Sequence, residues 1–266
     1  RGTEYGLEQV YNVIDSRCER CVLDAISVGY RSIDTAQAYG NEEAVGNAIR
    51  KCGVPRNELF ITTKVWISNG GYEKAKVSLK ESLRKLQTEY IDLVLIHQPF
   101  NDYYGTYRAM EEACKEGWIR AIGVSNFYPD RLIDLCNFVE VKPAINQVET
   151  HVFQQQAQAH EYMVKYGVQH ESWGPFAEGR KDFFTNPVLM EIGKKYNKSA
   201  AQTALRFLIQ SGVVVIPKST HKERMIQNID VFDFVLSGED MLAIQALDAK
   251  ESLFFSHYDP AAVERL

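Results

Sequence analysis

The sequence predicts an α/β protein built as a (β/α)8 TIM barrel, and three observations carry that prediction. Short apolar runs rich in β-branched residues alternate with helical patterns along the chain. The runs are almost continuously apolar, which is typical of strands buried on both faces of a parallel sheet. No GxGxxG motif follows a run, so an open, doubly wound nucleotide-binding sheet is the weaker alternative.

Seven of the eight strands that such a barrel needs are visible as apolar runs. They cover residues 30–35, 59–65, 91–97, 119–125, 144–149, 168–173 and 213–217. We expect the eighth strand at residues 5–11. Because crossovers between parallel strands are right-handed, this count predicts closure into a barrel.

Helices are expected between these strands. They cover residues 42–52, 72–86, 103–115, 129–136, 155–165, 199–209, 222–230 and 237–248. Gly53 and Pro55 end the first of them, and Ser237 with Asp240 forms a capping pattern at the start of the last. No linker or repeat interrupts this order, so residues 1–266 are predicted to form a single domain.

Composition and charge narrow the class of function. The chain has 45% hydrophobic and 24% charged residues, near the average for globular proteins, and a net charge of −5. It shows no basic face of the kind that nucleic-acid binders carry, which favours a small molecule as the partner. It also shows no signal peptide and no stretch of eighteen apolar residues, so no membrane span is predicted. We expect a monomer.

The cysteines favour a reducing compartment. Five cysteines are an odd number and do not form the dense framework of a small secreted domain, so we expect a cytoplasmic protein. Cys18 and Cys21 form a CxxC motif inside the amphipathic helical pattern of residues 16–29. No second CxxC or histidine pair accompanies it, so a zinc or redox role is the weaker alternative and no metal site is predicted.

Polar residues end most of the apolar runs. In a barrel the active site lies at these carboxyl ends of the strands. Taken singly, Asp34 could cap a helix, Lys64 could reach solvent and His97 could be a hydrogen-bonded core residue. Together they are expected to converge on one barrel mouth. The remaining polar or aromatic strand ends are Ser125, Asn126, Gln147, Glu149, Trp173, Lys218 and Ser219.

Six stretches of the chain resemble the aldo-keto reductase superfamily. They are YRSIDTAQAYGNEEAVGNAI, LFITTKVW, YIDLVLIHQP, IRAIGVSNF, INQVE and VVVIPKS, and they follow one another in order over most of the chain. The DTAxxYGNE and GVSNF motifs are the most specific of them. The chain is most similar to bacterial members of the 2,5-diketo-gluconate reductase and glyoxal reductase type, which reduce small carbonyl compounds.

The resemblance implies that Tyr39 is the general acid of a carbonyl reduction. Asp34 and Lys64 would support it as an ion pair, and His97 would orient the substrate carbonyl. Hydride transfer to a carbonyl carbon builds negative charge on the oxygen, which a nearby proton donor neutralises. Because a free tyrosine has a pKa of about 10, we expect the Lys64 cation to lower the pKa of Tyr39.

The resemblance also implies a site for NADPH. Ser125, Asn126 and Gln147 would hold the nicotinamide carboxamide, and Trp173 would stack on the ring where the family commonly has a tyrosine. In the segment IPKSTHKERMIQN, the 2′-phosphate would lie on Lys218, Ser219 and Arg224, and the adenine would face Gln227 and Asn228. An arginine beside a lysine suits a dianion, which favours NADPH over NADH. The alternative for this segment is a solvated basic helix start.

Two regions depart from the family pattern. Gly6 corresponds to the first glycine of a PxLGxGT-like first strand, but Glu8 stands where the second is expected, so no site residue is assigned before Asp34. The tail over residues 252–266 is short, which suggests an open pocket. Trp66 and Phe176 are expected to be apolar walls of the pocket, and residues 101–107 a lid. The segment WGPFAEG adds Gly174 and Phe176 to the candidate cofactor site.

The leading hypothesis is therefore an NADPH-dependent reductase of small aldehydes and ketones such as dicarbonyls and keto sugars. One alternative is a cofactor-binding regulatory subunit on the same barrel with little turnover, which the intact set around Tyr39 disfavours. Another is a phosphate-binding barrel isomerase, for which Glu149 is the candidate base.

Overall fold

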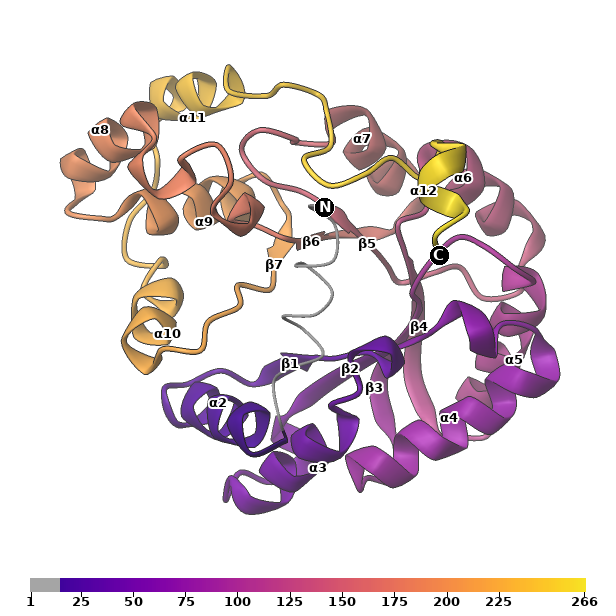
Figure 1. Cartoon of the computed structure of the whole chain (residues 1–266). Helices are drawn as coiled ribbons and strands as arrows, with labels where there is room; N and C mark the ends of the chain where they lie inside the picture. Colours follow the sequence, from indigo (N-terminus) through magenta and orange to yellow (C-terminus); the bar gives the residue numbers. More distant parts are fainter. Residues whose placement is uncertain (1–14) are drawn as a thin grey trace. The chain divides into compact units, whose positions relative to one another are not determined.

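The computed structural model describes residues 15–266, and for side chains residues 17–266. Within that range the residues group into two compact units. The first comprises the described residues up to Ser125, Asp134–Ala144 and Thr220–Lys222. The second comprises Asn126–Ile133, Ile145–Ser219 and Glu223–Leu266. Each unit is a set of parallel strands with helices (Figure 1).

The first unit contains four parallel strands, each paired with the next along the chain. They are β1 (Ser32–Asp34), β2 (Phe60–Val65), β3 (Ile91–Ile96) and β4 (Ile119–Ser125). The helices that lie wholly in this unit are α2 (Asp15–Ser27), α3 (Glu42–Lys51), α4 (Tyr72–Leu86) and α5 (Tyr103–Lys115). Figure 1 shows α3, α4 and α5 succeeding one another along one side of the strands.

The second unit contains three parallel strands, β5 (Ile145–Glu149), β6 (Gln169–Trp173) and β7 (Val214–Val215), again paired in chain order. Its helices, with α6 and α10 shared between the two units, are α6 (Pro129–Phe138), α7 (Ala157–Tyr166), α8 (Pro187–Tyr196), α9 (Ala200–Gln210), α10 (Lys222–Ile229), α11 (Gly238–Gln245) and α12 (Pro260–Val263).

The strand β3 is the most completely buried strand of the first unit. All six residues of β3 are buried, including Asp92. A buried carboxylate needs partners, and Asp92 has three: it accepts from the backbone N–H of Ile61 (2.9 Å) and pairs with Arg56 (2.7 Å) and Arg120 (3.1 Å). These bonds fix the amino end of β3 against β2, so the carboxyl ends of both strands are set in register.

The second unit has an apolar core of its own. Phe207 and Leu208 of α9 lie in it beside Leu189 and Ile192 of α8. The helix α9 begins at a capping box, in which the Ser199 hydroxyl accepts from Gln202 N–H and the Gln202 side chain accepts from Ser199 N–H. Local sequence and core packing therefore place this helix at the same residues.

The predicted elements agree with the structure at most positions. All seven predicted strands from residue 30 onward are confirmed, although 213–217 shortens to the two residues of β7. The strand expected at 5–11 lies outside the described residues. The helices α8 and α12 were not expected; an Asn186–Pro187 start, with the Asn186 side chain accepting two backbone N–H groups, is the signal for α8. The single domain stays a prediction. Within residues 15–266 no helix has both the length and the apolar character that a bilayer-crossing segment needs.

Candidate active site

Three successive strands of the first unit end in the predicted polar residues. Asp34 is the last residue of β1, Lys64 lies one residue before the end of β2, and His97 follows β3. The parallel register sets Asp34 opposite Thr62 and Lys64 opposite Leu95. The backbone N–H of His97 continues the ladder by donating to the carbonyl of Val65 (3.1 Å). The three side chains therefore arise from the same edge of these strands.

Lys64 is completely buried and its ammonium group is paired. It forms an ion pair with Asp34, whose side chain is 12% exposed, and donates a hydrogen bond to the Thr35 carbonyl (3.0 Å). A buried ammonium is expensive unless it is paired and hydrogen-bonded. The structure therefore keeps a fixed positive charge at the end of β2.

Tyr39 lies beside this charge. It ends the short 3-10 helix Gln37–Tyr39 that follows β1, and Gly40 (φ 65°) turns the chain away into α3. The Lys64 Nζ atom lies 5.1 Å from the centre of the Tyr39 ring. The His97 ring stands edge-on to Tyr39 at 5.6 Å, and Trp66 stands edge-on to His97 at 5.1 Å. The structure thus brings Asp34, Tyr39, Lys64, His97 and Trp66 together.

The pKa of Tyr39 is raised from its ordinary value, which corrects the expected net decrease. Burial is the largest cause; Lys64 lowers the pKa as a nearby cation and hydrogen-bond donor, and Asp34 raises it. Without the Lys64 charge the increase would be greater. Tyr39 is therefore protonated at neutral pH, which is the state that a proton donor needs.

His97 is neutral at neutral pH. Burial first, and then the Lys64 cation, hold the pKa of this imidazole well below its usual 6.5. A neutral imidazole has one N–H donor and one acceptor nitrogen. It can therefore donate a hydrogen bond to a carbonyl oxygen without competing with Tyr39 as a strong acid.

Gln37 is a positioning residue that sequence reasoning missed. Its carboxamide oxygen accepts from the backbone N–H of Trp66 (3.0 Å) and from the Asn69 side chain (2.9 Å). Its carboxamide nitrogen donates to the hydroxyl groups of Ser78 and Ser82, both at 3.1 Å. The signal was its place between Asp34 and Tyr39 in DTAQAY, but the partners on α4 are 41 and 45 residues away.

In the second unit, the predicted nicotinamide residues Asn126 and Trp173 contact each other. The Trp173 indole donates to the Asn126 side-chain oxygen (2.8 Å). Asn126 has a left-handed backbone (φ 62°), and its N–H donates to the carbonyl of Gln147 (2.9 Å). The Gln147 amide donates to the buried Glu171. Ser125 is buried at the end of β4, in the first unit.

A small pocket adjoins this pair. Its lining combines residues that follow β4, residues at the ends of β5 and β6 and in the loop after β5, and residues of the C-terminal segment: Asn126, Tyr128, Val148, Glu149, Gln154, Gln156, Trp173, Ser252, Phe255 and His257. Fixed amide groups beside an indole face suit a flat heteroaromatic carboxamide. The residues present therefore fit the nicotinamide that the sequence predicted.

The predicted phosphate residues follow β7. Lys218, Arg224 and Gln227 are exposed, Ser219 is half-buried, and Asn228 is buried (8% exposed) on α10. Among residues 17–266 neither Lys218 nor Arg224 has an ion-pair partner, in contrast to Lys195 and Lys198 nearby. Two exposed, unpaired cations on a loop and the helix after it fit a phosphate dianion.

Phe176 and Gly174, the two further candidate cofactor residues, lie beside phenylalanine rings of the second unit. The Phe176 ring packs against Phe183 (5.9 Å) and Phe184 (5.7 Å), so it belongs to an aromatic cluster of the second unit. Gly174 has φ 64°, and a Cβ atom there would meet the ring of Phe254 at 3.9 Å. Its neighbour Trp173 is also in contact with Phe254 (5.1 Å).

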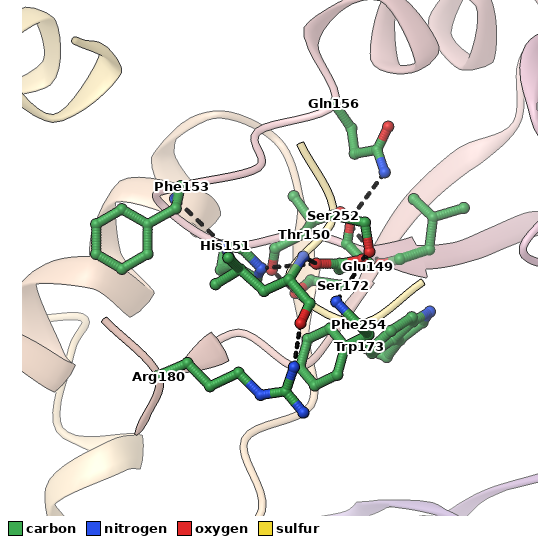
Figure 2. Close-up of polar contacts among 12 residues, drawn as sticks. Glu149, Thr150, His151, Phe153, Gln156, Ser172, Trp173, Arg180, Ser252 and Phe254 are labelled. Atoms are coloured by element: carbon green, nitrogen blue, oxygen red, sulfur yellow. Dashed lines mark hydrogen bonds and ion pairs between the residues drawn. The ribbon is translucent and has the colours of Figure 1, made fainter. Parts of the chain in front are cut away.

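Glu149 does not have the surroundings of a catalytic base. Its carboxylate accepts from the Ser252 hydroxyl, the Leu253 N–H (2.9 Å) and His151 Nε2 (3.0 Å). Figure 2 shows Ser252 and His151 beside Glu149. Because these bonds engage both oxygens, the isomerase alternative loses its candidate. In the described part of the chain no three histidine, cysteine or acidic side chains are grouped as a metal site would need.

An ion-paired lysine, a half-buried tyrosine and a neutral histidine at parallel strand ends define a carbonyl-reducing class of site. The Aldo/keto reductase family model matches residues 6–249. Glyoxal reductase of Bacillus subtilis is 50% identical over 228 residues, which cover 85% of this chain and 82% of that protein. An aldo-keto reductase from a Medee basin deep-sea metagenome library, MGS-M4, has a similar structure: the TM-score is 0.90 at 42% identity over 92% of this chain and 91% of that one. For a Bombyx mori aldo-keto reductase in complex with NADP, the TM-score is 0.87 at 34% identity, over 95% and 88% of the two chains.

The chain belongs to the aldo/keto reductase family. The resemblance drawn from its motifs is confirmed, and so is the (β/α)8 fold class, which it shares with the solved members. With the family, the predictions of an oxidoreductase and of NADPH as the cofactor are confirmed. The roles of individual residues stay predictions.

Proposed function

We propose that this protein reduces small aldehydes and ketones to alcohols, dicarbonyl compounds above all, with Tyr39 as the proton donor. The observation that carries the proposal is the surroundings of Tyr39. Its protonated phenol lies beside the buried Lys64–Asp34 pair and edge-on to a neutral His97. Tyr39 is protonated and His97 is neutral at neutral pH, which are the states that a reduction requires of these two groups.

The proposed proton path uses only these side chains. Bound NADPH supplies the hydride. As charge develops on the carbonyl oxygen, the Tyr39 hydroxyl gives it a proton, and His97 donates a second hydrogen bond to the same oxygen. Lys64 then stabilises the tyrosinate that remains, and Asp34 holds Lys64 in place.

NADPH would be held by the residues that the sequence predicted. We assign the carboxamide to Ser125, Asn126 and Gln147, and the stacked ring to Trp173. The 2′-phosphate is assigned to Lys218, Ser219 and Arg224, and the adenine to Gln227 and Asn228. The hydrogen bond between Trp173 and Asn126 supports the first assignment, and the unpaired charges of Lys218 and Arg224 support the second.

Trp66 supports a preference for small carbonyl compounds. The indole stands edge-on to His97, and the Trp66 backbone is fixed by Gln37. The predicted lid begins at Asn101, whose amide donates to the Ile67 carbonyl (2.9 Å), and Thr106 accepts from Gly71 N–H (2.8 Å). These bonds limit the opening of the segments around Trp66, which favours small substrates. The names of relatives such as glyoxal reductase and methylglyoxal reductase point the same way. We further propose that the enzyme is a monomer, that it is cytoplasmic and that it folds as a single domain. We also propose that it does not bind nucleic acid.

The test follows the absorbance of NADPH with glyoxal, methylglyoxal, simple aldehydes and diketo sugars. We expect turnover with the dicarbonyl compounds, and a loss of about a hundredfold to ten thousandfold in kcat for Tyr39→Phe. The NADPH affinity of that variant should be close to that of the native protein. Tyr162→Phe, which removes a hydroxyl on α7, is the matched control. Tight NADPH binding with no carbonyl reduced would overturn the proposal and favour the regulatory alternative.

A further inference from the structure

The C-terminal segment is fastened to the end of β5 by Glu149. This carboxylate is 5% exposed and accepts from both the Ser252 hydroxyl and the Leu253 N–H. Ser252 and Leu253 lie 103 and 104 positions after Glu149 in the chain. Figure 2 shows Ser252 lying beside Glu149.

His151 fixes the direction of the Glu149 carboxylate. The Phe153 N–H donates to His151 Nδ1 (3.2 Å), so the ring proton is on Nε2, which lies 3.0 Å from Glu149 Oε1 and donates to it. His151 is completely buried. The His151 N–H thus fixes the Glu149 carboxylate, and the carboxylate accepts its other hydrogen bonds from the C-terminal segment.

Arg180 holds the same segment from the other side. Its guanidinium donates to the Leu253 carbonyl and lies over the Phe254 ring, 4.2 Å from the ring centre. Both backbone polar groups of Leu253 therefore have charged partners, its N–H in Glu149 and its carbonyl in Arg180. We call the set Glu149, Arg180, Ser252, Leu253 and Phe254 the tail clamp (Figure 2).

The tail clamp holds the Phe254 ring in contact with Trp173. Phe254 meets the indole edge-on, with 5.1 Å between ring centres and 61° between planes. Glu149 and Trp173 are also register partners in the pairing of β5 with β6. The other side of the contact is fixed as well, because the Trp173 N–H donates to Asn126. The orientation of the indole is therefore set from two directions.

We propose that Glu149 is a positioning residue for the nicotinamide end of the cofactor site, acting through the tail clamp on Trp173. The inference rests on the proposed function, in which Trp173 stacks on the nicotinamide. Glu149 lines the small pocket beside Trp173, but both of its carboxylate oxygens are engaged by Ser252, Leu253 and His151, so it acts on the cofactor site through these bonds. Its charge is the essential property, since one carboxylate accepts three hydrogen bonds, which a carboxamide with one oxygen satisfies poorly.

The test compares three variants of the full chain. Glu149→Gln keeps the shape of the side chain and removes its charge. Phe254→Leu leaves the hydrogen bonds of the tail clamp in place and removes the ring that contacts Trp173; because Phe254 is only half-buried, this variant is expected to fold. Glu251→Gln makes the same chemical change at an exposed position of the same segment and is the control.

The first readout needs no cofactor. The indole N–H resonance of Trp173, assigned through Trp173→Phe among the three tryptophans, reports its hydrogen bond and ring environment. It should shift in Glu149→Gln and Phe254→Leu and stay in place in Glu251→Gln. The second readout is the Kd for NADPH and for NADH by fluorescence titration. Because both cofactors share the nicotinamide, both Kd values should rise by the same factor, about threefold to tenfold.

The outcomes separate this inference from the proposed function. If the native protein binds NADPH and reduces carbonyl compounds but Glu149→Gln leaves the Trp173 resonance and both Kd values unchanged, the inference is overturned. A greater loss for NADPH than for NADH in Glu149→Gln would also overturn it, since that pattern belongs to the phosphate end. If the native protein reduces nothing, the proposed function fails, whereas the resonance shift still tests the clamp.

Discussion

Tyr39 must satisfy two opposed requirements at the scale of one residue. It has to hold its proton until a carbonyl oxygen needs it, and it has to leave an anion that the protein tolerates. Burial serves the first requirement by raising its pKa, and the Lys64 cation serves the second by opposing that increase. The rigid pairing of Lys64 with Asp34 keeps the cation in place for both.

The pH dependence of reduction follows from these directions. Tyr39 acts protonated, so the rate of reduction is lost only as the pH rises through its raised pKa; His97 acts neutral, and its pKa lies well below 6.5. We therefore expect kcat for reduction, measured with saturating NADPH, to be flat from about pH 6 to about pH 9. A midpoint of activity loss near neutral pH would show that another group donates the proton.

Residue identity was easier to predict than residue environment. Asp34, Lys64 and His97 were found because polar groups that end apolar runs are visible in the sequence. The direction of the Tyr39 pKa was wrong because burial depends on how the site is closed around it, which a motif does not report. Gln37 and the partners of Glu149 were missed since their contacts join residues far apart in the chain.

At the scale of elements, the Gln37 carboxamide joins the turn after β1 to the end of β2 and to α4. In Gln37→Leu the Trp66 N–H loses its acceptor, which costs about 1–3 kcal/mol of the free energy of unfolding. We also expect KM for small carbonyl compounds to rise severalfold, because Trp66 lies against His97. Urea unfolding and steady-state kinetics measure the two effects.

Gln37→Glu is the matched variant for this position. A glutamate keeps the oxygen that accepts from Trp66 and Asn69, and the Ser78 and Ser82 hydroxyl groups can turn to donate to it. The KM of Gln37→Glu for small carbonyl compounds should therefore stay close to that of the native protein. An equal rise of KM in both variants would mean that Gln37 acts by some route other than its bond to Trp66.

The segment from β7 to α10 makes a separate prediction about cofactor preference. Arg224 is exposed and has no ion-pair partner among residues 17–266, so its removal should leave the fold intact. We expect Arg224→Ala to raise the Kd for NADPH about tenfold to a hundredfold, the effect of losing charge-assisted hydrogen bonds to a phosphate. The Kd for NADH should hardly change.

Arg265→Ala, at an exposed position near the C-terminus, is the control for this measurement. If Arg224→Ala weakened NADPH and NADH equally, the assignment of Arg224 to the 2′-phosphate would be wrong. The same titrations distinguish this end of the site from the tail clamp, for which equal losses are expected.

At the scale of the whole molecule, the alternation of strands and helices was predicted well because it depends on local periodicity. The run at 213–217 shortened to Val214–Val215, since strand length depends on pairing with a neighbour as well as on apolar character. The helix α8 escaped because its start is an Asn186 cap with a proline, in a loop-like stretch of sequence. Family membership then gave the barrel fold class, which local patterns only suggested.

Acid should destabilise the molecule through buried neutral histidines, of which His170 is the clearest case. It is 1% exposed on β6, where its ring contacts Thr150 (2.8 Å) and His160 (3.0 Å). Burial, and next the charge of His160, lower the pKa of His170 from 6.5 to about 3.

The unfolded chain takes up a proton on this histidine below about pH 6.5, while the folded protein does not until about pH 3. The part of the stability that depends on neutral His170 is therefore fully present above about pH 6.5 and is lost as the pH decreases toward 3. Between about pH 6.5 and about pH 4 this proton uptake by the unfolded chain lowers the free energy of unfolding by about 3 kcal/mol. Urea unfolding of native protein and His170→Gln across this range measures it. The variant should start less stable at neutral pH and show a shallower loss in acid; parallel curves would mean that His170 does not carry the acid sensitivity.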